Sequence, residues 1–96
     1  MTISISTHVL DVERGKPASG VRVELWQEDL ITTGETDGDG RIANLASELE
    51  PGVYRILFRP DSQFFRGVGI EVSLDEGHYH VPLLVSSYSC VTYRGS

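Results

Sequence analysis

The residues of this sequence best suited to acid–base chemistry are three histidines, His8, His78 and His80. Imidazole exchanges protons near neutral pH, which makes it a common general base for activating water. His8 is out of phase with the apolar residues Ile3 and Ile5, so on a strand it lies on the opposite face. His78 and His80 are two residues apart and share one strand face. We therefore expect all three imidazoles to project from the polar faces of β-strands.

Arg41 is a fourth candidate, because it follows the turn sequence Asp37-Gly38-Asp39-Gly40. That sequence invites a calcium-loop interpretation, but an EF-hand needs Asp or Asn at the fifth position and Gly at the sixth. Arg41 and Ile42 stand there instead, so we interpret the segment as a tight turn that delivers Arg41 to the start of a strand. Thr92–Ser96 carries an aromatic ring and a guanidinium, which is unusual for a chain end.

Two alternatives stay open for the histidines. His78 and His80 on one strand face could bind zinc if a third ligand joined them, and His8 could be that ligand. No spacing in the sequence requires this arrangement. A lone surface histidine with no role is the other alternative. Neither a Gly-x-Ser-x-Gly elbow nor a phosphate-binding glycine loop occurs in the sequence.

Length and composition limit the classes of protein. With 96 residues the chain has room for one domain, residues 1–96, and little room for a deep private cleft. Eight basic and 14 acidic residues give a net charge of −6, which argues against nucleic acid or an anionic membrane surface as a partner. The single cysteine, Cys90, excludes an intramolecular disulfide. We find no signal peptide and no membrane-spanning run, so a cytoplasmic location is the default expectation.

The elements that must position these residues follow from a hydrophobic period of two, which predicts an all-β chain. We expect eight short strands separated by turns, a pattern typical of a β-sandwich. Ala46–Leu49 is the only segment for which we expect a helical turn. The predicted strands are Ile3–Val9, Val21–Trp26, Leu30–Thr36, Arg41–Leu45, Val53–Arg59, Val68–Leu74, Tyr79–Val85 and Tyr88–Arg94.

Four motifs are spread along the chain in a fixed order. They are Thr7-His8-Val9-Leu10-Asp11 followed by Gly15-Lys16-Pro17-Ala18-Ser19-Gly20-Val21, then Asp37-Gly38-Asp39-Gly40-Arg41, Tyr79-His80-Val81-Pro82-Leu83-Leu84, and Tyr93-Arg94-Gly95-Ser96. Together they resemble the motifs of the transthyretin-like 5-hydroxyisourate hydrolases, and they cover the chain from end to end.

The resemblance implies the transthyretin sandwich of two four-stranded sheets. The family's short helix after the fifth strand should be reduced or absent here, because Pro60-Asp61-Ser62-Gln63 leads almost directly to Phe64. The resemblance also implies a homotetramer with active sites at the dimer–dimer interface. The implied reaction is hydrolysis of 5-hydroxyisourate to 2-oxo-4-hydroxy-4-carboxy-5-ureidoimidazoline in urate catabolism, with no cofactor and no metal.

Residue by residue, the resemblance implies catalytic roles for His8, Arg41, His80 and Ser96, and substrate contacts for His8, Arg41 and Tyr93. A planar, permanently cationic guanidinium suits the charge that develops on an attacked carbonyl oxygen. Either His80 or His8 could be the base that deprotonates water. The resemblance gives His78 no role.

Two departures and two rival functions accompany the resemblance. Ser87 stands where the family commonly has proline, and Cys90 stands where it commonly has tyrosine; we interpret Cys90 as a packed thiol rather than a nucleophile. A transthyretin-type ligand carrier shares the fold but lacks the His/Arg/His set and the terminal tetrapeptide. Some turn motifs of this chain also resemble those of structural β-sandwich modules, but membership of that class does not account for His8 or His80.

Overall fold

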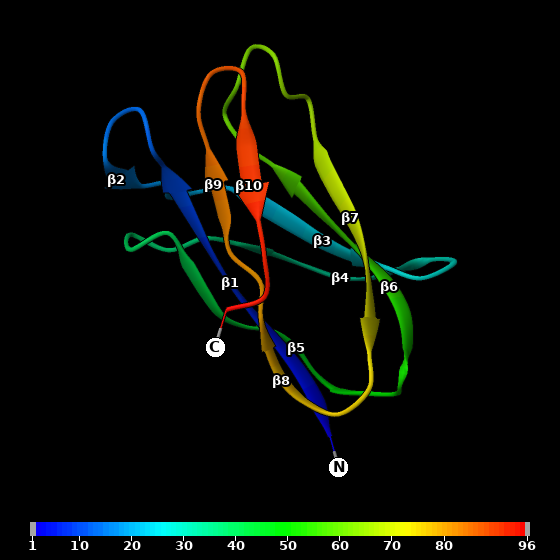
Figure 1. The fold of residues 1–96 in the computed structure, drawn as a ribbon. Coiled ribbons are helices and arrows are strands. Elements are labelled where there is room, and N and C mark those ends of the chain that lie inside the picture. Colours follow the sequence, from blue (N-terminus) through cyan, green and yellow to red (C-terminus); the bar gives the residue numbers. More distant parts are fainter. Residues whose placement is uncertain (1, 96) are drawn as a thin grey trace.

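Every regular element of the computed structural model, which describes residues 2–95, is a β-strand (Figure 1). The ten strands form two sheets that share one core. In chain order they are β1 (Ile3–Asp11), β2 (Lys16–Pro17), β3 (Arg22–Trp26), β4 (Leu30–Glu35), β5 (Arg41–Leu49), β6 (Gly52–Arg59), β7 (Val68–Leu74), β8 (Gly77–His80), β9 (Leu83–Val85) and β10 (Cys90–Thr92).

One sheet is antiparallel and has the order β4-β3-β6-β7. Its inner face follows the predicted alternation: Val23, Leu25, Ile56 and Phe58 are each fully buried. These strands match four of the predicted ones closely, because long runs of alternating β-branched and aromatic residues specify both a strand and its buried face.

The second sheet is built on both edges of β1. On one edge β1 pairs in parallel with β8 and then β9, and β10 pairs with the far side of β9. On the other edge β1 pairs antiparallel with β5 and then β2. The sheet is therefore four positions wide, and two of those positions are each shared by two strands, β8 with β9 and β5 with β2. This arrangement confirms the predicted all-β sandwich of two four-stranded layers.

The predicted strand Tyr79–Val85 is divided because Pro82 has no backbone N–H to donate to a ladder. β8 ends at His80 and β9 begins at Leu83. Two bonds hold the gap against β1: the Val81 N–H donates to the Ser6 carbonyl (2.9 Å), and the Thr7 hydroxyl donates to the Val81 carbonyl (2.6 Å). The last predicted strand is also shorter than expected and covers Cys90–Thr92 only.

The prediction of a helical turn at Ala46–Leu49 is wrong. These residues extend β5, where Ala46 pairs with Ile5 and Leu49 pairs with Ile3. Nine residues of β5 lie opposite six of β1, so the ladder contains bulges, and Glu48 has a left-handed φ of 55°. Ala46 and Leu49 both pack on the core, which explains why strand pairing prevails over local helix propensity.

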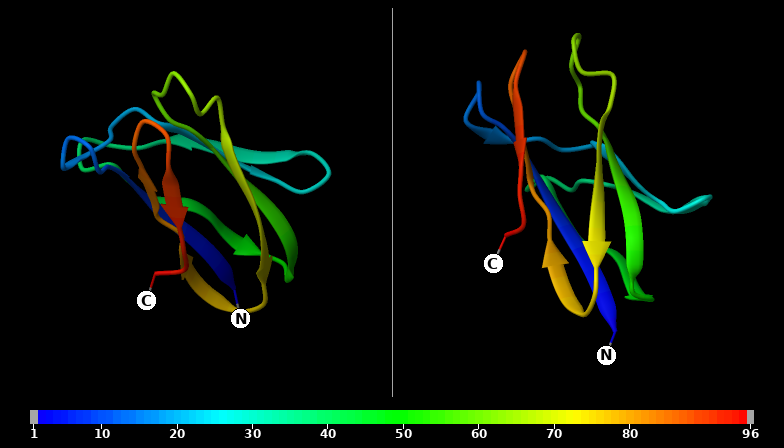
Figure 2. Two further views of the ribbon diagram at one scale, coloured as in Figure 1. Left: turned by 45° about the horizontal axis from the view of Figure 1, so that its top comes forward. Right: turned by 45° about the vertical axis from the view of Figure 1, so that its right-hand side comes forward.

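The connections between strands project from the sandwich in several directions (Figures 1 and 2). The β1–β2, β6–β7 and β9–β10 connections gather at one end of the sandwich, while the β3–β4 hairpin extends from its side. The β6–β7 connection contains no helix, and the Ser62 hydroxyl accepts hydrogen bonds there from the Phe64 and Phe65 N–H groups. Cys90 is half-buried and packs against the core, as predicted. Residues 2–95 contain no helix that is long and apolar enough to cross a membrane.

Gly40, which precedes the predicted site residue Arg41, has a φ of +75°. A Cβ built there would lie 2.5 Å from the Val9 carbonyl oxygen and 3.1 Å from the Ala18 nitrogen. We expect Gly40→Ala to lower the free energy of unfolding by about 2 kcal/mol, measured by urea denaturation. Gly38→Ala is the matched control, because its Cβ would meet no heavy atom within 4 Å. Equal effects of the two substitutions would contradict this reading of the turn.

Candidate active site on the outer face of the β1 sheet

The register of the β1 sheet brings together residues that are far apart in sequence. Because directly paired residues point to the same face of a sheet, three pairs line the outer face of β1. One edge of β1 contributes two of the pairs, and the other edge contributes one. The pairs are Ser4 with His78, Ser6 with His80, and His8 with Arg41. The structure thus places His8, Arg41 and His80 in one cluster, on the face predicted for the histidines.

His80 is half-buried and held on two sides. Its Nδ1 lies 2.7 Å from the Ser6 hydroxyl, and its carbonyl accepts a 2.6 Å bond from the Gly95 N–H. Burial lowers the pKa of His80 below its usual value, and the nearby charges of Arg41, His8 and His78 lower it further. This shift in pKa favours the uncharged His80 imidazole, the form that can accept a proton.

His8 is oriented by the turn that precedes β5. Its Nε2 lies 2.8 Å from the Asp39 carbonyl oxygen. A carbonyl only accepts hydrogen bonds, so Nε2 carries the proton and Nδ1 is the basic nitrogen of the neutral ring. The two histidines of the cluster therefore use opposite ring nitrogens in contacts with the protein.

The turn that carries Arg41 is closed by the Asp37 carboxylate. Asp37 Oδ1 accepts hydrogen bonds from the N–H groups of Asp39 (2.9 Å) and Arg41 (3.0 Å), and the Asp37 N–H donates to the Arg41 carbonyl. The backbone N–H groups of Arg41 and Asp39 hold the pKa of Asp37 below its usual range. The segment is thus a turn, as predicted, and no metal-ligand group of three His, Cys, Asp or Glu occurs within residues 2–95.

The C-terminal segment lies along His80 at Gly95, whereas Tyr93 lines a pocket elsewhere. Gly95 forms an isolated bridge with His80, and the Arg94 guanidinium stacks over the Tyr79 ring at 4.2 Å from its centroid. Tyr93 is more than half exposed and lines a pocket of about 390 Å³ between β7 and β10. In the single chain Tyr93 therefore lies outside the histidine–arginine cluster. Ser96 falls outside the described residues.

Three polar residues of the site were given no role from sequence, although they share its face. The two ring nitrogens of His78 contact Ser4 Oγ (2.6 Å) and Ser6 Oγ (2.8 Å). The alternation of Ser4, Ser6 and His8 along one strand face was the available signal. The parallel pairing of β1 with β8 was the missing piece, since hydrophobic periodicity gives a strand's faces and not its neighbours.

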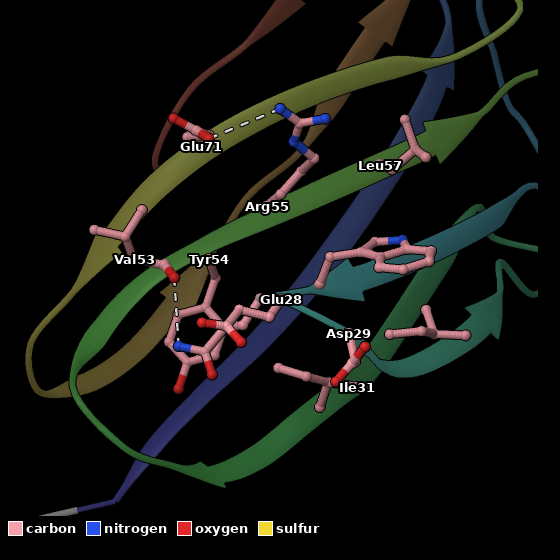
Figure 3. Close-up of a pocket in the computed structure, with 11 residues that line it drawn as sticks. Glu28, Asp29, Ile31, Val53, Tyr54, Arg55, Leu57 and Glu71 are labelled. Carbon is pink, nitrogen blue, oxygen red and sulfur yellow. Dashed lines mark hydrogen bonds and ion pairs between the residues drawn. The ribbon is translucent and has the colours of Figure 1, made fainter.

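A separate groove of about 860 Å³ lies on the other sheet, between the β3–β4 hairpin and the outer faces of β6 and β7 (Figure 3). Arg55 on β6 and Glu71 on β7 form an exposed ion pair on one wall of the groove, with their nearest N and O atoms 3.7 Å apart. Trp26 forms part of its wall and is anchored by a 2.8 Å bond from its indole N–H to Glu24. None of His8, Arg41 or His80 lines this groove, so its size does not make it the site of the chemistry.

The sequence of this chain is similar to those of known proteins. Residues 5–95 match the model of the HIUase/Transthyretin family. The chain belongs to this family. A relative in the family, the 5-hydroxyisourate hydrolase of Salmonella dublin, is 42% identical over 109 aligned residues, which cover 96% of this chain and 80% of the relative.

Solved structures of the family show how widely its fold is shared. The Klebsiella pneumoniae 5-hydroxyisourate hydrolase superimposes with a TM-score of 0.89 at 33% identity, covering 97% of this chain and 98% of that one. Sea bream transthyretin in complex with thyroxine superimposes with a TM-score of 0.85 at 29% identity, covering 95% and 93%. A hydrolase and a thyroxine-bound transthyretin are thus nearly equal matches in fold, so the side chains of the site must distinguish the two functions.

The lowered pKa of His80 gives a prediction that needs no substrate. We expect the His80 ring to titrate below its usual value of about 6.5 in an NMR pH series. Removing the positive charge with Arg41→Gln should raise this pKa, because Arg41 is one of its causes. The pKa of His80 is lower in the folded protein than in the unfolded chain, so protonation of His80 favours unfolding. The contribution of His80 to the free energy of unfolding is therefore fully present above the unfolded pKa and is lost as the pH falls through the folded pKa. A His80 pKa that is unmoved in Arg41→Gln would contradict the proximity of the two groups.

Proposed function

We propose that this chain hydrolyses 5-hydroxyisourate to 2-oxo-4-hydroxy-4-carboxy-5-ureidoimidazoline, a step of urate degradation. The observation that carries the proposal is the half-buried His80 beside Arg41 and His8 on one sheet face. Family membership and the relatives named as 5-hydroxyisourate hydrolases support it. The cytoplasmic location expected from sequence stays a prediction.

The proposed reaction is attack of water on the cyclic amide of the substrate. His80 accepts a proton from water at Nε2, because Nδ1 is engaged by Ser6. The hydroxide forms a bond to the ring carbonyl carbon, and the Arg41 guanidinium stabilises the resulting oxyanion. The C–N bond then breaks, the leaving nitrogen takes a proton from the imidazolium, and the ring opens to a carboxylic acid. His8 is the alternative base, through Nδ1.

We further propose that a second subunit completes the site in a homotetramer. The cluster lies on an exposed sheet face rather than in an enclosed cavity, so a lone chain excludes little water from the reacting atoms. A facing subunit would cover this sheet at a dimer–dimer interface. Tyr93 as a substrate contact and Ser96 as a catalytic residue belong to this part of the proposal, with Ser96 contributing a hydroxyl or a terminal carboxylate.

A non-enzymatic carrier is the second candidate, favoured by the close structural match to a thyroxine-bound transthyretin. A carrier has no need for an imidazole whose pKa is lowered and whose neighbours are cationic. A structural module has no need for either feature. Both alternatives predict that the chain does not accelerate the decay of 5-hydroxyisourate.

The deciding assay generates 5-hydroxyisourate in situ with uricase and follows its ultraviolet decay. We expect the wild-type chain to accelerate the decay, and His80→Ala and Arg41→Ala each to reduce kcat/KM by about 100-fold or more while leaving the assembly intact. Arg66→Ala, which removes an exposed arginine from the β6–β7 connection, is the matched control and should keep full activity. Wild-type activity in either site variant would remove that residue from the mechanism.

Gly95 gives a second prediction, because a Cβ there would lie 2.8 Å from His80 Cδ2 and 3.3 Å from its carbonyl oxygen. We expect Gly95→Ala to displace the His80 ring and lower kcat about 10-fold in the same assay, since small displacements of a reacting group are costly. Gly38→Ala serves again as the control. Unchanged turnover in Gly95→Ala would show that the C-terminal segment does not position His80.

A further inference from the structure

Four side chains on the outer face of the β1 sheet form one continuous chain of hydrogen bonds. Ser4 Oγ lies 2.6 Å from His78 Nδ1, His78 Nε2 lies 2.8 Å from Ser6 Oγ, and Ser6 Oγ lies 2.7 Å from His80 Nδ1. The Ser6 hydroxyl is thus the single link between the two imidazoles. Ser6 is only 9% exposed, so this link is largely shielded from water.

The chemistry of these groups restricts the direction of the chain. A hydroxyl has one proton to donate, and a neutral imidazole has one N–H and one basic nitrogen. All three bonds are satisfied when every group donates in the same direction. If His80 Nδ1–H donates to Ser6, then Ser6 donates to His78 Nε2, and His78 Nδ1–H donates to Ser4. In the opposite direction His80 carries its proton on Nε2 instead.

We infer that His78 and Ser6 act as positioning residues that relay a proton to and from His80. This inference rests on the proposed hydrolase function. In the first direction His80 Nε2 is free of a proton and able to act as the base. When Nε2 takes a proton from water, the Nδ1 proton passes to Ser6, and the Ser6 hydroxyl proton passes to His78 Nε2. One proton enters at His80 and one positive charge arrives on His78, with no other bond changed.

The same chain runs backwards in the second half of the reaction. The His78 Nε2 proton returns to Ser6, the Ser6 proton returns to His80 Nδ1, and the His80 Nε2 proton goes to the leaving nitrogen. The relay thus returns to its starting state after each turnover. It needs no co-reactant beyond the water that is consumed.

The surroundings favour the charge on His78 rather than on His80. His80 is half-buried and faces the positive charge of Arg41 from β5, with His8 on β1 nearby. His78 is exposed in the single chain, and it pairs with Ser4, four residues along β1 from His8. The Arg94 guanidinium also lies near it, and its Nη2 donates to the His78 carbonyl oxygen at 3.4 Å; this contact is exposed, so water screens the charge. Passing the charge outward relieves its repulsion with Arg41.

The kinetic test removes each link in turn. We expect Ser6→Ala and His78→Gln to lower kcat about 10-fold with KM nearly unchanged. Glutamine keeps a hydrogen-bonding group near Ser6 but does not take up a proton. In mixtures of H2O and D2O, kcat of the wild-type chain should depend non-linearly on the deuterium fraction, because more than one proton moves. In both variants the dependence should become linear, a change that a structural role alone would not cause.

Ser19→Ala, which removes an exposed hydroxyl between β2 and β3, is the matched control. A readout that needs no turnover accompanies it: ¹⁵N NMR of labelled histidine should show that Ser6→Ala alters the His80 tautomer ratio and that His78→Gln does so too. A linear isotope dependence in an active wild-type chain overturns the relay and leaves the hydrolase function standing. So do a wild-type kcat, a non-linear isotope dependence and an unchanged His80 tautomer ratio in both variants. An inactive wild-type chain overturns the hydrolase function, and the relay as a catalytic device with it, whatever the tautomers show.

Discussion

Strand β1 is hydrogen-bonded along both edges, and its period of two is the constraint on which the site depends. Ile3, Ile5 and Val9 are fully buried between the sheets, so Ser6 and His8 must face outward. A slip of one residue would bury the polar set and expose the apolar one, which fixes the register firmly. The buried face of this strand thus determines the position of the polar groups on its other face, although none of its apolar core residues takes part in the proposed chemistry.

The two ladders of β1 position different residues of the site. The parallel ladder with β8 brings His80 to Ser6, whereas the antiparallel ladder with β5 brings Arg41 to His8. A local feature limits each ladder: Pro82 interrupts the strand that pairs with one edge of β1, and the Asp37 turn precedes the first residue of β5 on the other edge. Partial burial and cationic neighbours then lower the pKa of His80 and favour its uncharged form. The proposed acid–base centre therefore needs no deep cavity, but it leaves one face of the site open.

Much of this arrangement is predictable from the sequence, and the failures have physical causes. Strands with long alternating runs, such as β3 and β6, were expected almost within their observed limits. The segment Ala46–Leu49 was not, because its local preference for a helix is overruled by pairing with β1. The outward faces of His8, His78 and His80 follow from alternation alone. That Ser6 lies between His78 and His80 does not, because it depends on a pairing between strands at opposite ends of the chain. Tyr93 shows the same limit, since its place depends on neighbours that periodicity does not reveal.

The parallel pairing of β1 with β8 also has a consequence for how the protein is made. Ser4 and His78 are separated by 74 positions along the chain, and so are Ser6 and His80. Closing so long a loop costs entropy before any contact repays it, and folds rich in such contacts form in milliseconds to seconds. On the ribosome, β1 emerges long before the strand that must complete its edge. Until that strand arrives, β1 presents an unpaired edge beside three apolar side chains, which is the kind of surface that chaperones protect from aggregation.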